Sequence, residues 1–136
     1  MYISETNIRV RYGETDQMGY VYYGNYTLYY EVGRVEALRQ LGFSYRDMEA
    51  KGIMLPVLSL QVKYIRPAFY DDLLTVKTII KELPQTKIHF HYEVYNEKKE
   101  LLNTGETTLV FINMESGKPC AAPDWFMYAL EQKFNG

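Results

Sequence analysis

The chain has little of what several large classes of protein depend on. One of its 136 residues is cysteine, Cys120, and two are histidine, so an intrachain disulfide framework and a four-cysteine zinc module are excluded. Lysine and arginine number 15 against 17 acidic residues, a formal net charge of −2, which argues against a general nucleic-acid binder. We therefore expect a cytoplasmic protein, since one cysteine suits a reducing compartment, with no nucleic-acid partner.

Long apolar runs are also missing. The most apolar stretch, residues 53–62, is interrupted by Pro56, Ser59 and Gln61 and is about half the ~20 residues that span a bilayer. The first ten residues lack the basic region and apolar core of a secretory signal. We expect no membrane insertion and, because no linker divides the chain, one domain over residues 1–136.

Three phosphate-binding and nucleophile motifs are absent as well. The chain contains no G-x-x-x-x-G-K-[ST], no G-x-G-x-x-G and no G-x-S-x-G, which removes the best support for nucleotide hydrolysis, dinucleotide redox chemistry and the α/β-hydrolase class. His89 and His91 share one strand face, but no third ligand lies at useful spacing. We expect solvated or hydrogen-bonded strand histidines, no metal and no other cofactor.

Residues 25–42 show the periodicity of a long helix. Apolar positions recur at steps of three and four, namely Tyr26, Tyr30, Gly33, Ala37 and Leu41. Asn25 suits the N-cap and Gly42 suits the left-handed residue just beyond the last turn. Arg34 falls outside the apolar stripe.

Elsewhere the period is mostly two, which predicts strands with one buried face. The expected strands are 8–12, 58–64, 74–80, 88–94 and 101–113, with Gly105 as a bulge or a close backbone approach. Ser44 and Asp47 resemble a capping box for a short helix at 45–51, and Pro123 suits the start of a C-terminal helix. Short turns favour antiparallel neighbours, so we expect an α+β fold whose exposed edge is covered by a second subunit.

The segment between the first strand and the long helix concentrates candidate functional residues. It carries Glu14 and Asp16, then Gly19, then the tyrosines at 20, 22 and 23. A helix N-terminus offers unpaired N–H groups and partial positive charge, which keep a nearby carboxylate ionised or polarise a carbonyl. From this chemistry alone, Asp16 either stabilises the helix start or serves a reaction.

Two stretches resemble a known family. The first is Tyr12-x-x-Thr15-Asp16-x-Met18-Gly19-x-Val21-x-x-x-Asn25-Tyr26 with Glu31 and Arg34; the second comprises Tyr64, Arg66, Pro67, Tyr70, Asp71 and Asp72. Together they are similar to the hotdog-fold acyl-CoA thioesterases of the 4-hydroxybenzoyl-CoA thioesterase type. The resemblance implies a five-stranded antiparallel sheet wrapped around one long helix, subunits paired through their sheets, and acyl-CoA entering between them.

The resemblance also implies catalytic groups. Asp16 takes the place of the family's carboxylate, acting as nucleophile or as general base on water, and a main-chain N–H of Tyr23 or Gly24 polarises the thioester carbonyl. Many relatives have histidine at or near position 23, whereas a tyrosine, with a free pKa near ~10, is no base at neutral pH. Glu14 is the fallback acid, because in an extended segment it would point the same way as Asp16.

Substrate contacts are assigned to Gly19, Tyr20, Asn25 and Tyr26, with Tyr22 and Met54 as further candidates for the acyl pocket. Arg66, with Lys63 nearby, is the candidate for the phosphates of CoA. The predicted assembly is a homodimer or a dimer of dimers. A catalytically silent acyl-CoA-binding module remains the alternative to a thioesterase, because fold alone does not determine function.

Overall fold

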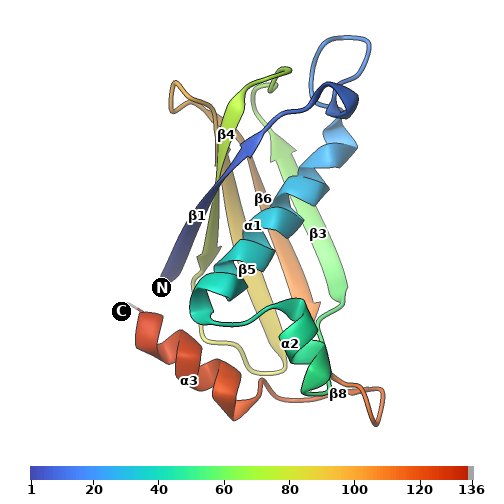
Figure 1. Ribbon diagram of the computed structural model, residues 1–136, viewed down its shortest axis with the longest axis vertical. Helices are drawn as coiled ribbons and strands as arrows, with labels where there is room; N and C mark the ends of the chain where they lie inside the picture. Colours follow the sequence, from blue (N-terminus) through green and yellow to red (C-terminus); the bar gives the residue numbers. More distant parts are fainter. Residues whose placement is uncertain (135–136) are drawn as a thin grey trace.

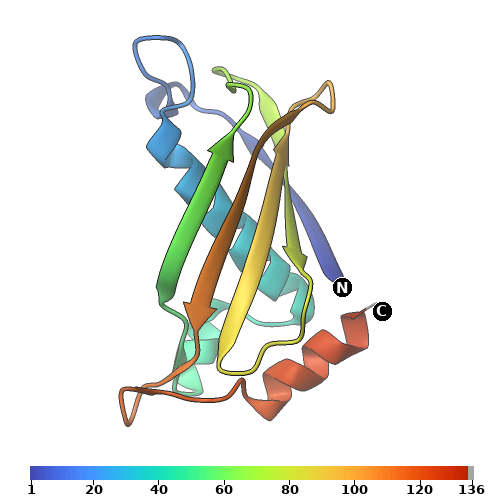
Figure 2. The ribbon, with the colours of Figure 1, turned by 180° about the vertical axis from the view of Figure 1, so that it is seen from behind.

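The computed structural model describes residues 1–134 and contains the predicted five-stranded antiparallel sheet. Its strands are β1 (Tyr2–Arg9), β3 (Val57–Tyr64), β4 (Leu73–Ile80), β5 (Lys87–Tyr95) and β6 (Leu101–Val110). They lie in the order β1-β4-β5-β6-β3, and every neighbouring pair is antiparallel. The sheet curls around one long helix, which covers a single face (Figure 1), while no helix of residues 1–134 covers the opposite face (Figure 2). The predicted hotdog arrangement is confirmed.

The long helix, α1 (Tyr26–Leu41), buries the predicted stripe except Leu41, which is half-buried, and also buries Tyr29, Arg34 and Leu38. Gly33 allows close approach to β4, because a Cβ there would lie 2.6 Å from Thr78 Oγ1 and 2.7 Å from Val76 Cγ1. The helix ends at Gly42, whose φ of 106° only glycine adopts readily. Gly105 on β6 supplies the second notch, where the ring of Tyr30 lies against the main chain. The close approach predicted at Gly105 is therefore present. The register shifts of the strands paired with β6 lie elsewhere, between Val94 and Tyr95 and between Val57 and Ser59.

Two details of α1 differ from the expectations. Asn25 makes no side-chain cap; its Nδ2 donates instead to the Glu14 carbonyl at 2.9 Å, because a 3₁₀ turn, η2 (Tyr23–Asn25), precedes the helix. Arg34, outside the apolar stripe, is only 7% exposed. Its guanidinium donates to the hydroxyls of Tyr45 and Tyr92, at 3.0 and 3.1 Å, and these bonds make the burial tolerable.

The first and last predicted strands were each placed partly wrong. Residues 10–12 lie beyond β1, because Glu14 Oε1 accepts from the Arg11 N–H at 2.8 Å and closes a 3₁₀ turn, η1 (Tyr12–Glu14). At the other end β6 stops at Val110. Phe111, fully buried, donates its N–H to the Thr86 carbonyl at 3.0 Å, and the chain leaves the main sheet.

A second, small sheet and two helices close the end of the molecule opposite the start of α1 (Figure 1). The small sheet contains β2 (Ile53–Met54), β7 (Ile112–Asn113) and β8 (Lys118–Pro119). The helix α2 (Tyr45–Ala50) begins with the predicted capping box of Ser44 and Asp47. The C-terminal helix α3 (Asp124–Lys133) packs its buried Phe126 against Phe111. No helix within residues 1–134 is long and apolar enough to cross a membrane.

One edge of the main sheet remains unpaired and partly apolar. Nearly every residue of β3 is exposed on both faces, including Leu58 at 53% and Leu60 at 44%. The other edge, β1, buries Tyr2 and Ser4 and presents mainly polar side chains to solvent. An edge strand with exposed leucines is a ready template for pairing with another chain.

Candidate active site

The segment from β1 to α1 folds into a tight loop that presents Asp16. The Asp16 N–H donates to the Tyr20 carbonyl at 2.8 Å, and the Gly19 N–H donates to the Asp16 carbonyl at 3.0 Å. Gly19 closes this turn with a φ of +82°, a conformation that costs other residues energy. Thr15 and Val21 pair as a bridge below the turn. Asp16 is thus held at the tip of a short hairpin instead of on a mobile strand end.

The Asp16 carboxyl is oriented by one main-chain bond. Its Oδ1 accepts from the Met18 N–H at 2.9 Å, the geometry in which an aspartate side chain imitates a backbone turn. Among residues 1–134, no donor is bonded to the other oxygen, Oδ2. One carboxylate oxygen is therefore positioned, and the other is free to meet a substrate or a water molecule.

Asp16 borders a pocket of about 330 Å³ that is mainly apolar. Of the residues predicted as site residues, Tyr20, Tyr23, Tyr26 and Arg66 also line it. The remaining lining comes from Met18, Val21, Tyr64, Ile65 and Pro67. The pocket therefore joins the hairpin tip, the start of α1 and the end of β3, three segments far apart in the sequence.

Other predicted residues do not line this pocket. Gly19 lines a neighbouring hollow of about 590 Å³, which Asp16 also borders. Gly24 lies in the η2 turn, where the Tyr22 ring leaves no room for a Cβ. Met54 lines a separate hollow next to Glu31 and Arg34, in the middle of α1. Within one protomer, the residues predicted for the acyl pocket are therefore not all brought together.

Glu14 is a poor substitute for Asp16. The alternation argument required an extended segment, but Glu14 lies in the η1 turn. Its carboxylate accepts from the Arg11 N–H at 2.8 Å and from the Tyr29 hydroxyl at 3.0 Å. Burial acts to raise the pKa of this carboxyl, but these bonds and the Arg11 guanidinium outweigh burial and lower it. Glu14 therefore holds the loop together.

The start of the helix lies beside this site, and two of its main-chain N–H groups have no bonded acceptor among residues 1–134. The Asn25 N–H already donates to the Tyr22 carbonyl at 2.8 Å. The two preceding N–H groups, of Tyr23 and Gly24, come before any intrahelical acceptor. Because the η2 turn continues into α1, they stand at the positive end of a rod that runs from Tyr23 to Leu41.

Tyr64 belongs to the second family motif but had no predicted role. In the structure its hydroxyl donates to the Tyr23 carbonyl at 3.0 Å. Its ring lies edge-to-face with that of Tyr23, with centroids 6.3 Å apart, and tilted against Tyr26 at 5.7 Å. No local pattern connects residues 41 positions apart, so only the shared motif could have indicated Tyr64.

Arg66 lies at the rim of the pocket, partly paired. Its Nη1 is 3.6 Å from Glu100 Oε2, and both side chains are exposed. Surface pairs of this kind contribute little to stability, so the guanidinium remains available to a phosphate. Lys63, predicted as its neighbour, instead lines a hollow on the uncovered face of the sheet.

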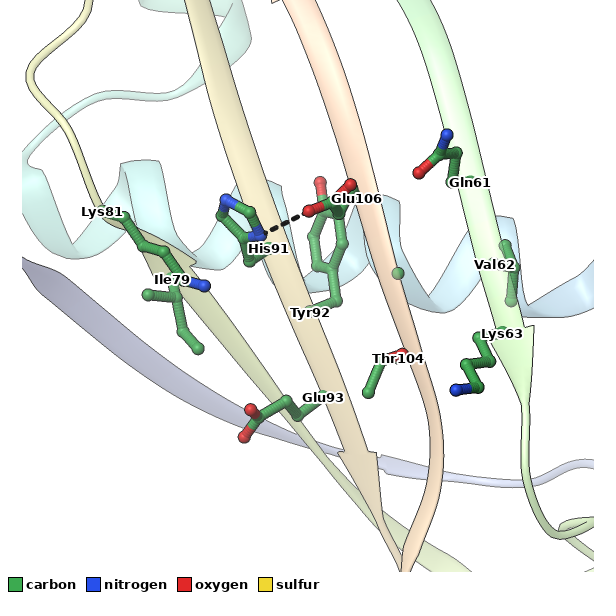
Figure 3. Close-up of a pocket in the computed structure, with 11 residues that line it drawn as sticks. Gln61, Val62, Lys63, Ile79, Lys81, His91, Tyr92, Glu93, Thr104 and Glu106 are labelled. Carbon is green, nitrogen blue, oxygen red and sulfur yellow. Dashed lines mark ion pairs between the residues drawn. The ribbon is translucent and has the colours of Figure 1, made fainter.

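The hollow on the uncovered face of the sheet, of about 580 Å³, is lined by one of the two histidines. Figure 3 shows His91 and Glu106 pointing toward each other across β5 and β6, with Nδ1 and Oε1 3.0 Å apart. Burial, followed by the charge of Lys81, lowers the pKa of His91. His89 Nδ1 lies 2.8 Å from Thr108 Oγ1. Within residues 1–134, no three His, Cys, Asp or Glu side chains gather into a possible metal site.

Comparison with known proteins points to one family. The model of the thioesterase-like superfamily matches residues 10–130. YneP of Bacillus subtilis, whose acyl-CoA thioesterase assignment is provisional, is 40% identical over 92% of this chain and 94% of its own length. The acyl-CoA thioester hydrolase YbgC of Escherichia coli O6:H1 is 34% identical over 92% of this chain and 93% of its own. The solved DHNA-CoA thioesterase of Staphylococcus aureus is 42% identical, with a TM-score of 0.88 over 97% of this chain and 92% of that one.

Proposed function

The chain belongs to the thioesterase-like superfamily, as a hotdog-fold acyl-CoA thioesterase of the 4-hydroxybenzoyl-CoA thioesterase type, and from this premise we propose that Asp16 carries the hydrolysis. The reaction adds water to an acyl-CoA thioester and releases a free acid and CoA. The observation that supports Asp16 is its place at the border of the apolar pocket, with one oxygen oriented by Met18.

An ionised Asp16 serves either of two routes. In the first, its free oxygen attacks the thioester carbonyl, CoA leaves as a thiolate, and water hydrolyses the resulting anhydride. In the second, the carboxylate takes a proton from a water molecule that attacks the carbonyl directly. Both routes require an anionic carboxylate beside the carbonyl carbon, and the position of Asp16 at the hairpin tip supports both.

Developing negative charge on the carbonyl oxygen needs a donor. We assign this role to the main-chain N–H groups of Tyr23 and Gly24 at the start of the helical rod. A preorganised oxyanion donor typically lowers a barrier by ~3 kcal/mol. The leaving thiolate has a free pKa near ~8.5 and departs readily, so no strong general acid is required.

The acyl group enters the pocket lined by Tyr20, Tyr23 and Tyr26. Gly19 and Asn25 do not line this pocket; Gly19 closes the hairpin turn that carries Asp16, and Asn25 bonds to the Glu14 carbonyl. Aromatic walls favour an aromatic acyl group through edge and face contacts. The similarity to a DHNA-CoA thioesterase makes aromatic acyl-CoA the first class to test, with Arg66 on the phosphates of CoA.

The protein assembles as a homodimer, or a dimer of such dimers, through the β3 edge. Pairing two copies of β3 satisfies the unpaired N–H and C=O groups of the strand and covers its exposed leucines. Because β3 also carries Tyr64 to the pocket, the partner subunit would lie beside the acyl site. The dimer would therefore narrow the entrance to the acyl pocket.

The experiment is a thiol-release assay on the purified protein. Aromatic acyl-CoA, including 1,4-dihydroxy-2-naphthoyl-CoA, is compared with short, medium and long aliphatic acyl-CoA and with carrier-protein thioesters. We expect free thiol above the buffer rate, and the fastest turnover with an aromatic acyl group. Turnover confined to aliphatic substrates would contradict the aromatic assignment, and no turnover of any thioester would favour a silent binding module.

A further inference from the structure

The turn that carries the oxyanion donors has no side-chain cap of its own. Tyr22, at the N-cap position of η2, makes no capping hydrogen bond. Asn25 is at the N-cap position of α1, but its side chain donates to the Glu14 carbonyl and does not cap the helix. An uncapped first turn frays readily, because its main-chain groups are held by few bonds. Another part of the fold must therefore keep these donors in one orientation.

Hydrogen bonds hold the η2 turn both to the loop that precedes it and to the sheet. The Glu14 carbonyl accepts from the Tyr22 N–H and from Asn25 Nδ2, both at 2.9 Å. On the sheet side, the Tyr64 hydroxyl donates to the Tyr23 carbonyl at 3.0 Å. The contacts of the Tyr64 ring with Tyr23 and Tyr26 place this hydroxyl against the turn.

The anchored carbonyl belongs to the same peptide unit as the Gly24 N–H. This bond is trans, and in a planar trans peptide the C=O and N–H groups point in opposite directions. A hydrogen bond that fixes the Tyr23 oxygen therefore also fixes the direction of the Gly24 N–H. Burial raises the pKa of the Tyr64 hydroxyl, so it keeps its proton and donates at neutral pH.

We propose that Tyr64 is a positioning residue for thioester hydrolysis, whose hydroxyl orients the Tyr23–Gly24 peptide as part of the oxyanion site. This inference rests on the proposed use of the Tyr23 and Gly24 N–H groups. Tyr64 also borders the pocket with Asp16, so β3 connects the subunit edge to the reacting centre. The hydroxyl acts on the rate through the peptide and takes no part in the chemistry.

The first test is Tyr64→Phe, which keeps the ring and removes the donor. Deleting an oxyanion donor outright typically costs 10²–10³-fold, and loosening one should cost less, so we expect kcat to fall about tenfold. KM should stay within about twofold and the melting temperature should change little. Tyr128→Phe, on the exposed face of α3, is the matched control and should behave like the wild type.

The second test is a spectroscopic signature that a purely structural role would not move. In the Asp16→Asn variant, which should bind acyl-CoA without turning it over, infrared difference spectra report the thioester C=O stretch. We expect a shift to lower frequency on binding, and a smaller shift in the Asp16→Asn/Tyr64→Phe double variant. Equal shifts, or a Tyr64→Phe enzyme with unchanged kcat, would overturn the role of Tyr64. The absence of any shift in Asp16→Asn would instead refute the oxyanion site itself.

Discussion

At the scale of single residues, two carboxylates two positions apart have different roles. Asp16 lies at a hairpin tip with one oxygen oriented by the Met18 N–H and the other without a bonded donor among residues 1–134. Glu14 accepts bonds from Arg11 and Tyr29. The same residue class is available for chemistry at one position and fully used for structure at the other.

The difference predicts the effect of substituting the acid. Asp16→Asn should lower kcat at least about 100-fold while acyl-CoA binding persists, because the amide neither attacks the thioester nor accepts a proton. Tyr23→Phe should cost less than about tenfold, since the main-chain N–H remains. Steady-state thiol release and calorimetric binding measure both. Equal large losses would mean that the phenol of Tyr23 takes part in the reaction.

Glu14 predicts an effect on stability below neutral pH. The pKa of its carboxyl is held below the ordinary value of 4.5. At pH values near and below 4.5 the unfolded chain therefore binds more protons than the folded one. The stabilisation is complete above pH 4.5 and is lost as the pH falls through the lowered pKa. Glu14→Gln should therefore show a smaller fall in melting temperature between about pH 6 and about pH 3.5 than the wild type.

The control for this measurement is Glu115→Gln, in the exposed loop between β7 and β8. This variant should follow the wild-type pH dependence. Identical acid sensitivity in the wild type and in Glu14→Gln would contradict the account of Glu14.

At the scale of elements, the packing of α1 on the sheet depends on two glycines, one on the helix and one on the sheet. Gly33 lets the helix meet β4, and Gly105 lets Tyr30 lie on the main chain of β6. Tyr30 in turn stacks on Tyr92 of β5, with centroids 4.4 Å apart and planes 6° apart. The absence of a side chain at these two positions therefore lets the helix pack closely on the sheet.

Filling either notch should destabilise the fold. Gly33→Ala and Gly105→Ala place a Cβ 2.6 Å from Thr78 Oγ1 and 2.6 Å from the Tyr30 hydroxyl oxygen, respectively. Overpacking of this kind typically costs about 1–3 kcal/mol, measurable by urea unfolding. Gly13→Ala, with no atom within 4 Å of the added Cβ, should stay within about 0.5 kcal/mol of the wild type. Equal free energies of unfolding for the three variants would contradict the close packing proposed at Gly33 and Gly105.

At the scale of the whole molecule, the two edges of the sheet differ in chemistry. Both edge strands have a strand partner on one side only among residues 1–134, but β1 is largely polar whereas β3 exposes leucines. The site lies at the end of the molecule where β3 finishes beside the start of α1 (Figures 1 and 2). The proposed subunit contact and the candidate site would therefore share one strand.

The β3 edge predicts the oligomeric state. Light scattering at micromolar concentration should give at least twice the chain mass of 16.0 kDa. Leu60→Lys should shift the population toward monomer, because lysine on an edge strand opposes pairing. Leu83→Lys, at an equally exposed leucine in the turn after β4, is the control. A monomeric wild-type protein would contradict pairing through β3.

Local sequence determined most of the elements and the identity of the candidate acid. Alternation at period two predicted the central strands, steps of three and four predicted α1, and Ser44 with Asp47 predicted the start of α2. These signals are local because each depends on residues within one or two turns of one another. The motif around Asp16 was readable for the same reason, since the hairpin that presents it is a short segment.

Tertiary structure decided the features that depend on distant partners. Phe111 leaves β6 for contacts with Phe126, Arg34 is buried by two tyrosine hydroxyls, and Tyr64 reaches the Tyr23 carbonyl across 41 residues. Periodicity carries no information about a hydrogen bond to a main-chain atom of another element, because any side chain of suitable length can make one. The candidate acid could therefore be found in the sequence, whereas the bond from Tyr64 to the Tyr23 carbonyl depends on how β3 packs against the η2 turn.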